Sequence, residues 1–98
     1  MKKESGFIDE SILQDAIDTF GASKQLTKLR EECQELALAI TQYERSQDLD
    51  KLKAVVDEAA DVKIVLAQFE KMIPGNILNN RVDFKMKRLQ EKIKNKDY

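Results

Sequence analysis

Apolar residues recur every three or four positions through most of this chain, the spacing that places them on one face of an α-helix. The pattern predicts four helices: one that Ser11 caps and that runs to about Phe20, a second that opens at Ser23 or Thr27, a third from about Leu49 to Met72, and a last one that begins between Asn76 and Asn80. The second helix shows the repeat at Leu26, Leu29, Cys33, Leu36, Ile40 and Tyr43. No segment alternates apolar and polar residues as a half-buried strand does. An all-α, four-helix bundle-like chain is therefore predicted.

Glycine, proline and polar residues divide these segments. Gly21 is placed to end the first helix, "RSQDLD" (residues 45–50) is the second break, and Pro74 with Gly75 stops the third helix. Residues 1–8 are expected to be a loose lead-in, and residues 94–98 a charged tail. A length of 98 residues suits one domain, residues 1–98.

Composition and charge restrict the partners, the location and the chemistry that can be expected of the chain. Hydrophobic residues make up 42% of the chain and charged residues 36%, which suits helices with solvated outer faces. A formal net charge of −1 provides no overall field that favours nucleic acid or an anionic membrane, so neither partner is expected. Without a membrane-spanning run or a signal-peptide pattern, a cytoplasmic protein is predicted. Because histidine is absent and Cys33 is alone, chemistry must rest on carboxylates, Lys, Arg, hydroxyls or a bound ion.

Carboxylates interrupt the apolar stretch "VVDEAADVKIVLAQF" (residues 55–69), where an unpaired charge is costly to bury. Helical geometry places Glu58 and Asp61 at the edge of this helix's core face, and Glu32 and Glu35 at the edge of the second helix's core face. If the two helices are neighbours, these carboxylates converge and their repulsion raises their pKa values. Mg²⁺ prefers oxygen ligands and keeps waters that phosphates can replace, so it is the expected occupant.

A plainer interpretation stays open for each of these groups. Glutamates three or four residues apart are usually a solvated helix face, paired with a lysine such as Lys28 or Lys63. Cys33 is expected to be a small core residue, because no histidine is present to activate it. The polar and basic cluster of the last helix is either a solvated face or a set of phosphate contacts: Asn79, Asn80, Arg81, Lys85, Lys87 and Arg88.

The two acidic motifs together resemble the signature of the MazG-like nucleoside triphosphate pyrophosphohydrolases, which belong to an all-α superfamily. That signature, E-E-x-x-E and then E-x-x-D, is matched by "EECQE" (residues 31–35) and "EAAD" (residues 58–61). The flanking segments "FGASKQLTKLREECQELALAI" and "DEAADVKIVLAQF" are similar to the family's two motif regions, and "KMKRL" to a basic stretch of small phage or prophage-type members. The resemblance covers about residues 20–93. Asp57 departs from it, since many members have Glu there.

The resemblance implies hydrolysis of an NTP or dNTP between its α and β phosphates, which gives the monophosphate and pyrophosphate. It implies Mg²⁺, or Mn²⁺ in its place, held by Glu32, Glu35, Glu58 and Asp61. The base that orients the attacking water is expected to be Glu31, with Glu35 as the alternative. Substrate-binding residues are expected at Gln25, Lys28, Lys85 and Arg88, and the aromatics nearest to a bound base are Phe20 and Phe7.

Two rival functions remain open at this point. One is a non-catalytic helical interaction module whose acids are surface charges, and the other is a nucleotide-binding regulator that keeps the metal pocket without turnover. In either case the chain is expected to self-associate. The helix over residues 49–72 is apolar on several sides, because Ile64 and Ala60 face away from the stripe that contains Val62 and Leu66, and such a helix needs neighbours on each side. A homodimer or homotetramer is predicted, as the resemblance also implies.

Overall fold

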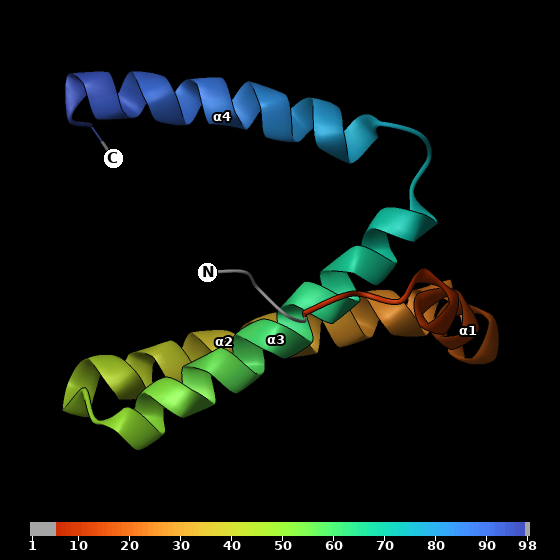
Figure 1. The fold of residues 1–98 in the computed structure, drawn as a ribbon, viewed down its shortest axis with the longest axis horizontal. Coiled ribbons are helices and arrows are strands. Elements are labelled where there is room, and N and C mark those ends of the chain that lie inside the picture. The colour runs from red at the N-terminus through yellow and green to blue at the C-terminus, as the bar shows by residue number, and fades with distance from the viewer. Residues whose placement is uncertain (1–5, 98) are drawn as a thin grey trace.

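The computed structural model describes residues 6–97 and consists of four α-helices (Figure 1). They are α1 (Glu10–Phe20), α2 (Ala22–Ser46), α3 (Leu49–Met72) and α4 (Ile77–Asn95). No strand occurs within that range, so the all-α prediction is confirmed. Of the predicted lead-in, residues 1–5 lie outside the described part, as does Tyr98 of the predicted tail. Lys94 and Asn95 are not tail but the last turn of α4.

The ends of the first two helices follow from local chemistry. Asp9, and not Ser11, caps α1: the Asp9 carboxylate accepts hydrogen bonds from the Ser11 backbone N–H at 2.9 Å and from the Ser11 hydroxyl at 2.7 Å. Gly21 ends α1 and at once precedes α2, with φ 90° and ψ 151°. Few residues other than glycine adopt that backbone conformation, so the two helices meet without a loop.

The connection between α2 and α3 is shorter than predicted. Helix α2 ends at Ser46 and α3 begins at Leu49, so that only Gln47 and Asp48 form the turn. Gln47 adopts the left-handed conformation, with φ 55°, and the Asp48 carboxylate accepts from the Lys51 backbone N–H at 2.9 Å. A turn this short makes α2 and α3 an antiparallel hairpin (Figure 1).

The packed part of the molecule is formed by α1, α2 and α3. The helices of the hairpin pack along each other, and α1 contacts both of them. An ion pair of 3.2 Å between Lys71 and Glu10 joins the end of α3 to the start of α1. Within residues 6–97, three apolar and three polar residues are buried: Leu13, Ala39, Val65, Gln25, Glu32 and Gln68.

The predicted core stripe of α2 is rotated from the one observed. Residues seven apart face α3, namely Gln25, Glu32 and Ala39, as in the seam of a coiled coil. Cys33, one position further round, is exposed, and Ile40 is 40% exposed. The prediction that Cys33 is a core residue was therefore wrong. The apolar repeat had marked a face that α3 covers only at its edge.

The last helix, α4, packs along none of the other three and extends away from them (Figure 1). The radius of gyration is 16.3 Å, whereas a compact chain of this length has about 13 Å. All side chains of α4 are at least partly exposed. None of the helices within residues 6–97 is long and apolar enough to cross a bilayer.

Candidate metal centre

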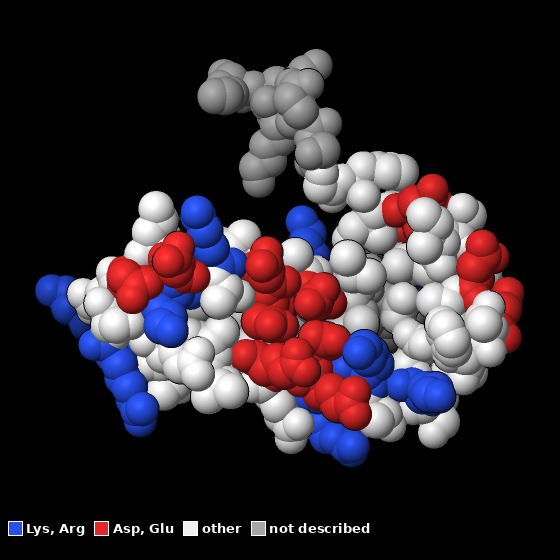
Figure 2. Space-filling view, turned by 90° about the horizontal axis from the view of Figure 1, so that it is seen from below, with Lys and Arg blue, Asp and Glu red and all other residues white. Residues whose placement is uncertain are grey.

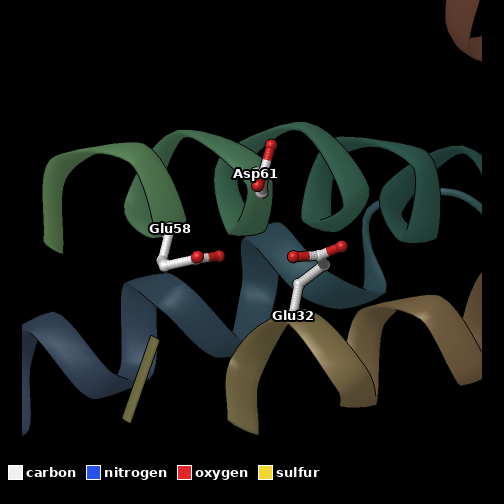
Figure 3. Close-up of side chains that lie close together, drawn as sticks. All are labelled: Glu32, Glu58 and Asp61. Carbon is white, nitrogen blue, oxygen red and sulfur yellow. The ribbon is translucent and has the colours of Figure 1, made fainter. Parts of the chain in front are cut away.

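Acidic side chains gather in the middle of the surface that the α2–α3 hairpin presents, with Lys or Arg side chains at their margin (Figure 2). Within this acidic region, Glu32 of α2 and Glu58 and Asp61 of α3 form a close group. Each offers a carboxylate oxygen that lies within 4.8 Å of those of the other two. Glu32 and Glu58 extend toward each other between the two helices (Figure 3). We call these residues the acidic triad.

The helical repeat explains how the triad forms. Glu58 and Asp61 are three residues apart, so α3 presents both on one side. Glu32 belongs to the row of α2 residues that faces α3, and it is only 7% exposed. The antiparallel hairpin then brings the middle of α2 against the middle of α3. The convergence predicted from the sequence is observed for these three acids.

Two oxygens of the triad are buried without a hydrogen-bond partner in the described chain, Oε1 of Glu32 and Oε1 of Glu58. The other oxygen of Glu32 lies 3.2 Å from the Lys28 ammonium, one turn earlier on α2. An enclosed carboxylate oxygen that lacks a donor is costly, because it has lost its hydration without a replacement. A cation or a hydrogen-bond donor placed next to these two oxygens would therefore stabilise the triad.

The pKa of Glu58 is shifted by the same burial and crowding of carboxylates. Its burial raises the pKa of Glu58 above the ordinary value, and the charges of Glu35, Asp61, Glu32 and Asp57 raise it further. The pKa of the Lys28 ammonium is also raised, because its hydrogen bond to Glu32 favours the charged form of the lysine. The negative charges around Glu58 thus outnumber the one lysine, Lys28, that pairs with the triad.

A divalent cation with oxygen ligands fits the triad. All three donors are carboxylates, which are the hard ligands that Mg²⁺ takes. Oxygens on opposite sides of one Mg²⁺ are about 4.2 Å apart, twice the Mg–O distance. The three oxygens all lie within 4.8 Å of one another, a spread of the same order as that distance. Bound there, the ion would neutralise the repulsion and satisfy the enclosed oxygens.

The other acids predicted for the site lie outside the triad. Glu35 is exposed on α2, yet close enough for its charge to rank first among those that raise the pKa of Glu58. Glu31 is also exposed, and its charge, like that of Glu35, raises the pKa of the Lys28 ammonium. Of these two acids, Glu35 is thus the one whose charge has a marked effect on the triad, through the pKa of Glu58.

The predicted substrate-binding residues divide into two groups. Gln25 and Lys28 line a cavity of about 360 Å³ between α1, α2 and α3. Lys85 and Arg88 lie together on α4, beside Leu89 and Lys92. Because α4 packs along none of the other helices, these two basic residues are not brought to the triad within one chain.

Two residues of this cavity bear on function. Phe20, which the sequence had suggested as a base contact, lines it, whereas Phe7 does not. Gln68 was not identified from the sequence, although it is 6% exposed and also lines the cavity. A signal existed: Gln68 is the one uncharged polar residue in the apolar run of α3, and it follows Asp61 by two helical turns.

Comparison with protein-family models, with curated proteins and with solved structures finds no match for this chain.

Proposed function

We propose that this chain is a Mg²⁺-dependent nucleoside triphosphate pyrophosphohydrolase, as the resemblance of its acidic motifs to the MazG-like enzymes implies. The acidic triad is the observation that supports the proposal. Its oxygens converge within 4.8 Å, and two of them are enclosed and lack a partner. A surface cluster of an interaction module gains nothing from that arrangement, since exposed carboxylates keep their hydration.

In the proposed reaction, Glu32, Glu58 and Asp61 hold the cation. When bound, Mg²⁺ supplies positive charge that binds phosphate oxygens and stabilises the leaving pyrophosphate. A water attacks the α phosphorus, the bond from this phosphorus to the bridging oxygen of the β phosphate breaks, and pyrophosphate leaves. We assign the proton of that water to Glu35, because Glu35 ranks first among the charges that raise the pKa of Glu58. Lys28 holds Glu32 in place.

The activity is tested with a panel of canonical and modified triphosphates, assayed by ³¹P NMR with Mg²⁺ or with EDTA. The expected products are monophosphate and pyrophosphate, formed with Mg²⁺ alone. Glu58→Gln is the matched inactive variant, since it keeps the size of the side chain and removes its charge. Orthophosphate as the product would place cleavage at the γ phosphate, and binding without any product would identify a regulator instead.

We infer that the working form contains at least two copies. The chain exposes 8157 Å², whereas a compact protein of 11.3 kDa exposes about 5,700 Å². The difference exceeds the roughly 800 Å² that each partner contributes to an interface of standard size. Large apolar side chains of α4 are among those exposed: Val82 is 47%, Met86 58% and Ile93 68% exposed.

Charge indicates how a second copy would be placed. Arg81, Lys85 and Arg88 recur at helical spacing along α4, next to its apolar stripe. The hairpin surface presents the opposite charge (Figure 2). A second copy whose α4 lies on this hairpin covers the apolar stripe and brings Lys85 and Arg88 toward the phosphates at the triad. This arrangement gives the two residues their predicted role.

A further inference from the structure

The cavity between α1, α2 and α3 adjoins the acidic triad without being part of it. At about 360 Å³ it falls in the range of small-ligand sites, about 300–1,000 Å³. Its lining is contributed by all three helices of the packed part: Ala16, Phe20, Lys24, Gln25, Lys28, Val65 and Gln68. The pocket thus combines an apolar interior with two carboxamides and two ammonium groups.

Gln68 is the informative residue of this lining. The residue is only 6% exposed, and its side-chain Oε1 is buried and has no hydrogen-bond partner within residues 6–97. Such an unsatisfied acceptor is unfavourable in a helix interface, where leucine would pack instead. A carboxamide can turn about its terminal bond and offer a donor and an acceptor side by side. That pair matches the edge of a nucleobase, which glutamine recognises through two hydrogen bonds.

Gln25, which α2 contributes to the lining of the cavity, is 8% exposed. Phe20 lines the cavity from α1, and the residue is 58% exposed, so it has a free surface that a flat ligand can cover. Bases stack on aromatic rings with little regard to sequence, because every base has a π face. Phe20 therefore provides affinity, and the carboxamides provide recognition.

The position of the cavity also suits one end of a nucleotide. Gln25 precedes Glu32 by seven residues on α2, and Gln68 follows Asp61 by seven on α3. Two helical turns correspond to about 10 Å, comparable with the span from the outer edge of a base, across the ribose, to the α phosphate. Lys28 lines the cavity and also contacts Glu32 at 3.2 Å, so it stands at the boundary between the two sites.

We propose that this cavity binds the base of the nucleoside triphosphate, with Gln68 and Gln25 hydrogen-bonded to the base edge and Phe20 stacked on its face. The substrate class is then a nucleotide, and a polyphosphate without a base is a poor substrate. This inference rests on the proposed function for the role of the triad. The cavity itself is testable without turnover.

The first experiment measures binding in EDTA, where no hydrolysis takes place. The ¹⁵N-labelled protein is titrated with each of the four deoxynucleoside monophosphates and with deoxyribose 5-phosphate. At least one monophosphate is expected to shift the backbone signals of residues 16–28 and 65–68 and the side-chain amide signals of Gln25 and Gln68. Shifts that are absent, or equal with deoxyribose 5-phosphate, would overturn the proposal.

The second experiment compares variants in turnover. Phe20→Ala is expected to raise KM about tenfold or more, from the loss of one stacked base, with kcat little changed. Gln68→Leu is expected to change the ratio of kcat/KM between bases, yet to melt no lower than the parent protein because an unsatisfied acceptor is removed. Gln42→Leu, an exposed glutamine near the other end of α2, is the control and should leave both quantities unchanged.

The two proposals fail in different ways. If monophosphates bind at the cavity and no triphosphate is hydrolysed, the base site stands and the proposed activity is wrong. If hydrolysis occurs while Gln68→Leu and Phe20→Ala leave KM and base preference at parental values, the activity stands and the base site is overturned.

Discussion

At the scale of single residues, Glu58 determines how the metal-free protein responds to pH. Its pKa is raised from the ordinary 4.5, so above that value the folded chain retains a proton that the unfolded chain has lost. The free energy of unfolding therefore falls as the pH rises through the window between the two pKa values, and it stays lower above that window. We expect Glu58→Gln to melt above the parent protein in EDTA at pH 7, and the difference to vanish below about pH 4.5.

The same pair of proteins tests the metal site by thermal melting. Mg²⁺ at about a hundred times its Kd adds about 2.7 kcal/mol to the stability of a protein with one site. We expect the parent protein to gain most of this and Glu58→Gln to gain little. Equal melting temperatures of the two proteins in EDTA at both pH values, together with equal gains from Mg²⁺, would contradict the triad as a cation site.

The assignment of the base is a second prediction at this scale. Glu35→Gln is expected to lower kcat by about a hundredfold or more, the typical contribution of a general base, while the stabilisation by Mg²⁺ is retained. Glu31→Gln is the matched control and should keep most of the activity. A loss of kcat with Glu31→Gln alone would assign the proton to Glu31, and a loss of the Mg²⁺ effect with Glu35→Gln would make Glu35 a ligand.

At the scale of elements, the junction between α1 and α2 depends on Gly21. Nothing lies within 4 Å of the position that a Cβ would take there, so the cost of Gly21→Ala comes from the backbone, whose φ is +90°. We expect a loss of about 1–3 kcal/mol in the free energy of unfolding, measured by urea denaturation. Because α1 carries Phe20, KM for the triphosphate should rise as well. Thr19→Ala, an exposed position near the end of α1, should change stability by less than about 0.5 kcal/mol.

At the scale of the whole molecule, self-association is expected because one chain leaves α4 uncovered. Light scattering across a wide concentration range should give a dimer or tetramer, and Ile93→Lys, within the apolar stripe, should shift the protein toward monomer. Glu91→Lys adds a lysine on the other side of α4 and should not. A mass near 11.3 kDa at all concentrations, with full activity, would contradict the inferred assembly.

The role of α4 at the phosphates follows from that assembly. Arg88→Ala is expected to raise KM for the triphosphate strongly while the melting temperature changes little, because it removes a phosphate contact supplied by the second copy. Lys94→Ala, another exposed cation on α4, is the control. Small and equal effects of the two variants would assign Arg88 to a solvated helix face.

Local chemistry alone determined the helices of this protein. Apolar periodicity, Gly21, and Pro74 with Gly75 fixed their number and nearly all their ends, since each of these signals acts within a few residues. The capping residue Asp9 was missed, because Asp and Ser are both good caps and lie two residues apart. The pairing of Glu32 with Glu58 and Asp61 was also predictable, because a short turn between two long helices makes them neighbours.

Only the tertiary structure decided which face of each helix is buried and where α4 lies. The apolar stripe of α2 is wide enough to allow several rotations, and packing against α3 selected the row with Gln25, Glu32 and Ala39 instead of the one with Cys33. That rotation of α2 placed Gln25 at the cavity and Glu35 outside the triad, and the packing of α3 placed Gln68 at the same cavity. Within one chain α4 packs along none of the other helices. Its amphipathic sequence predicts that it needs a partner but not which surface provides one.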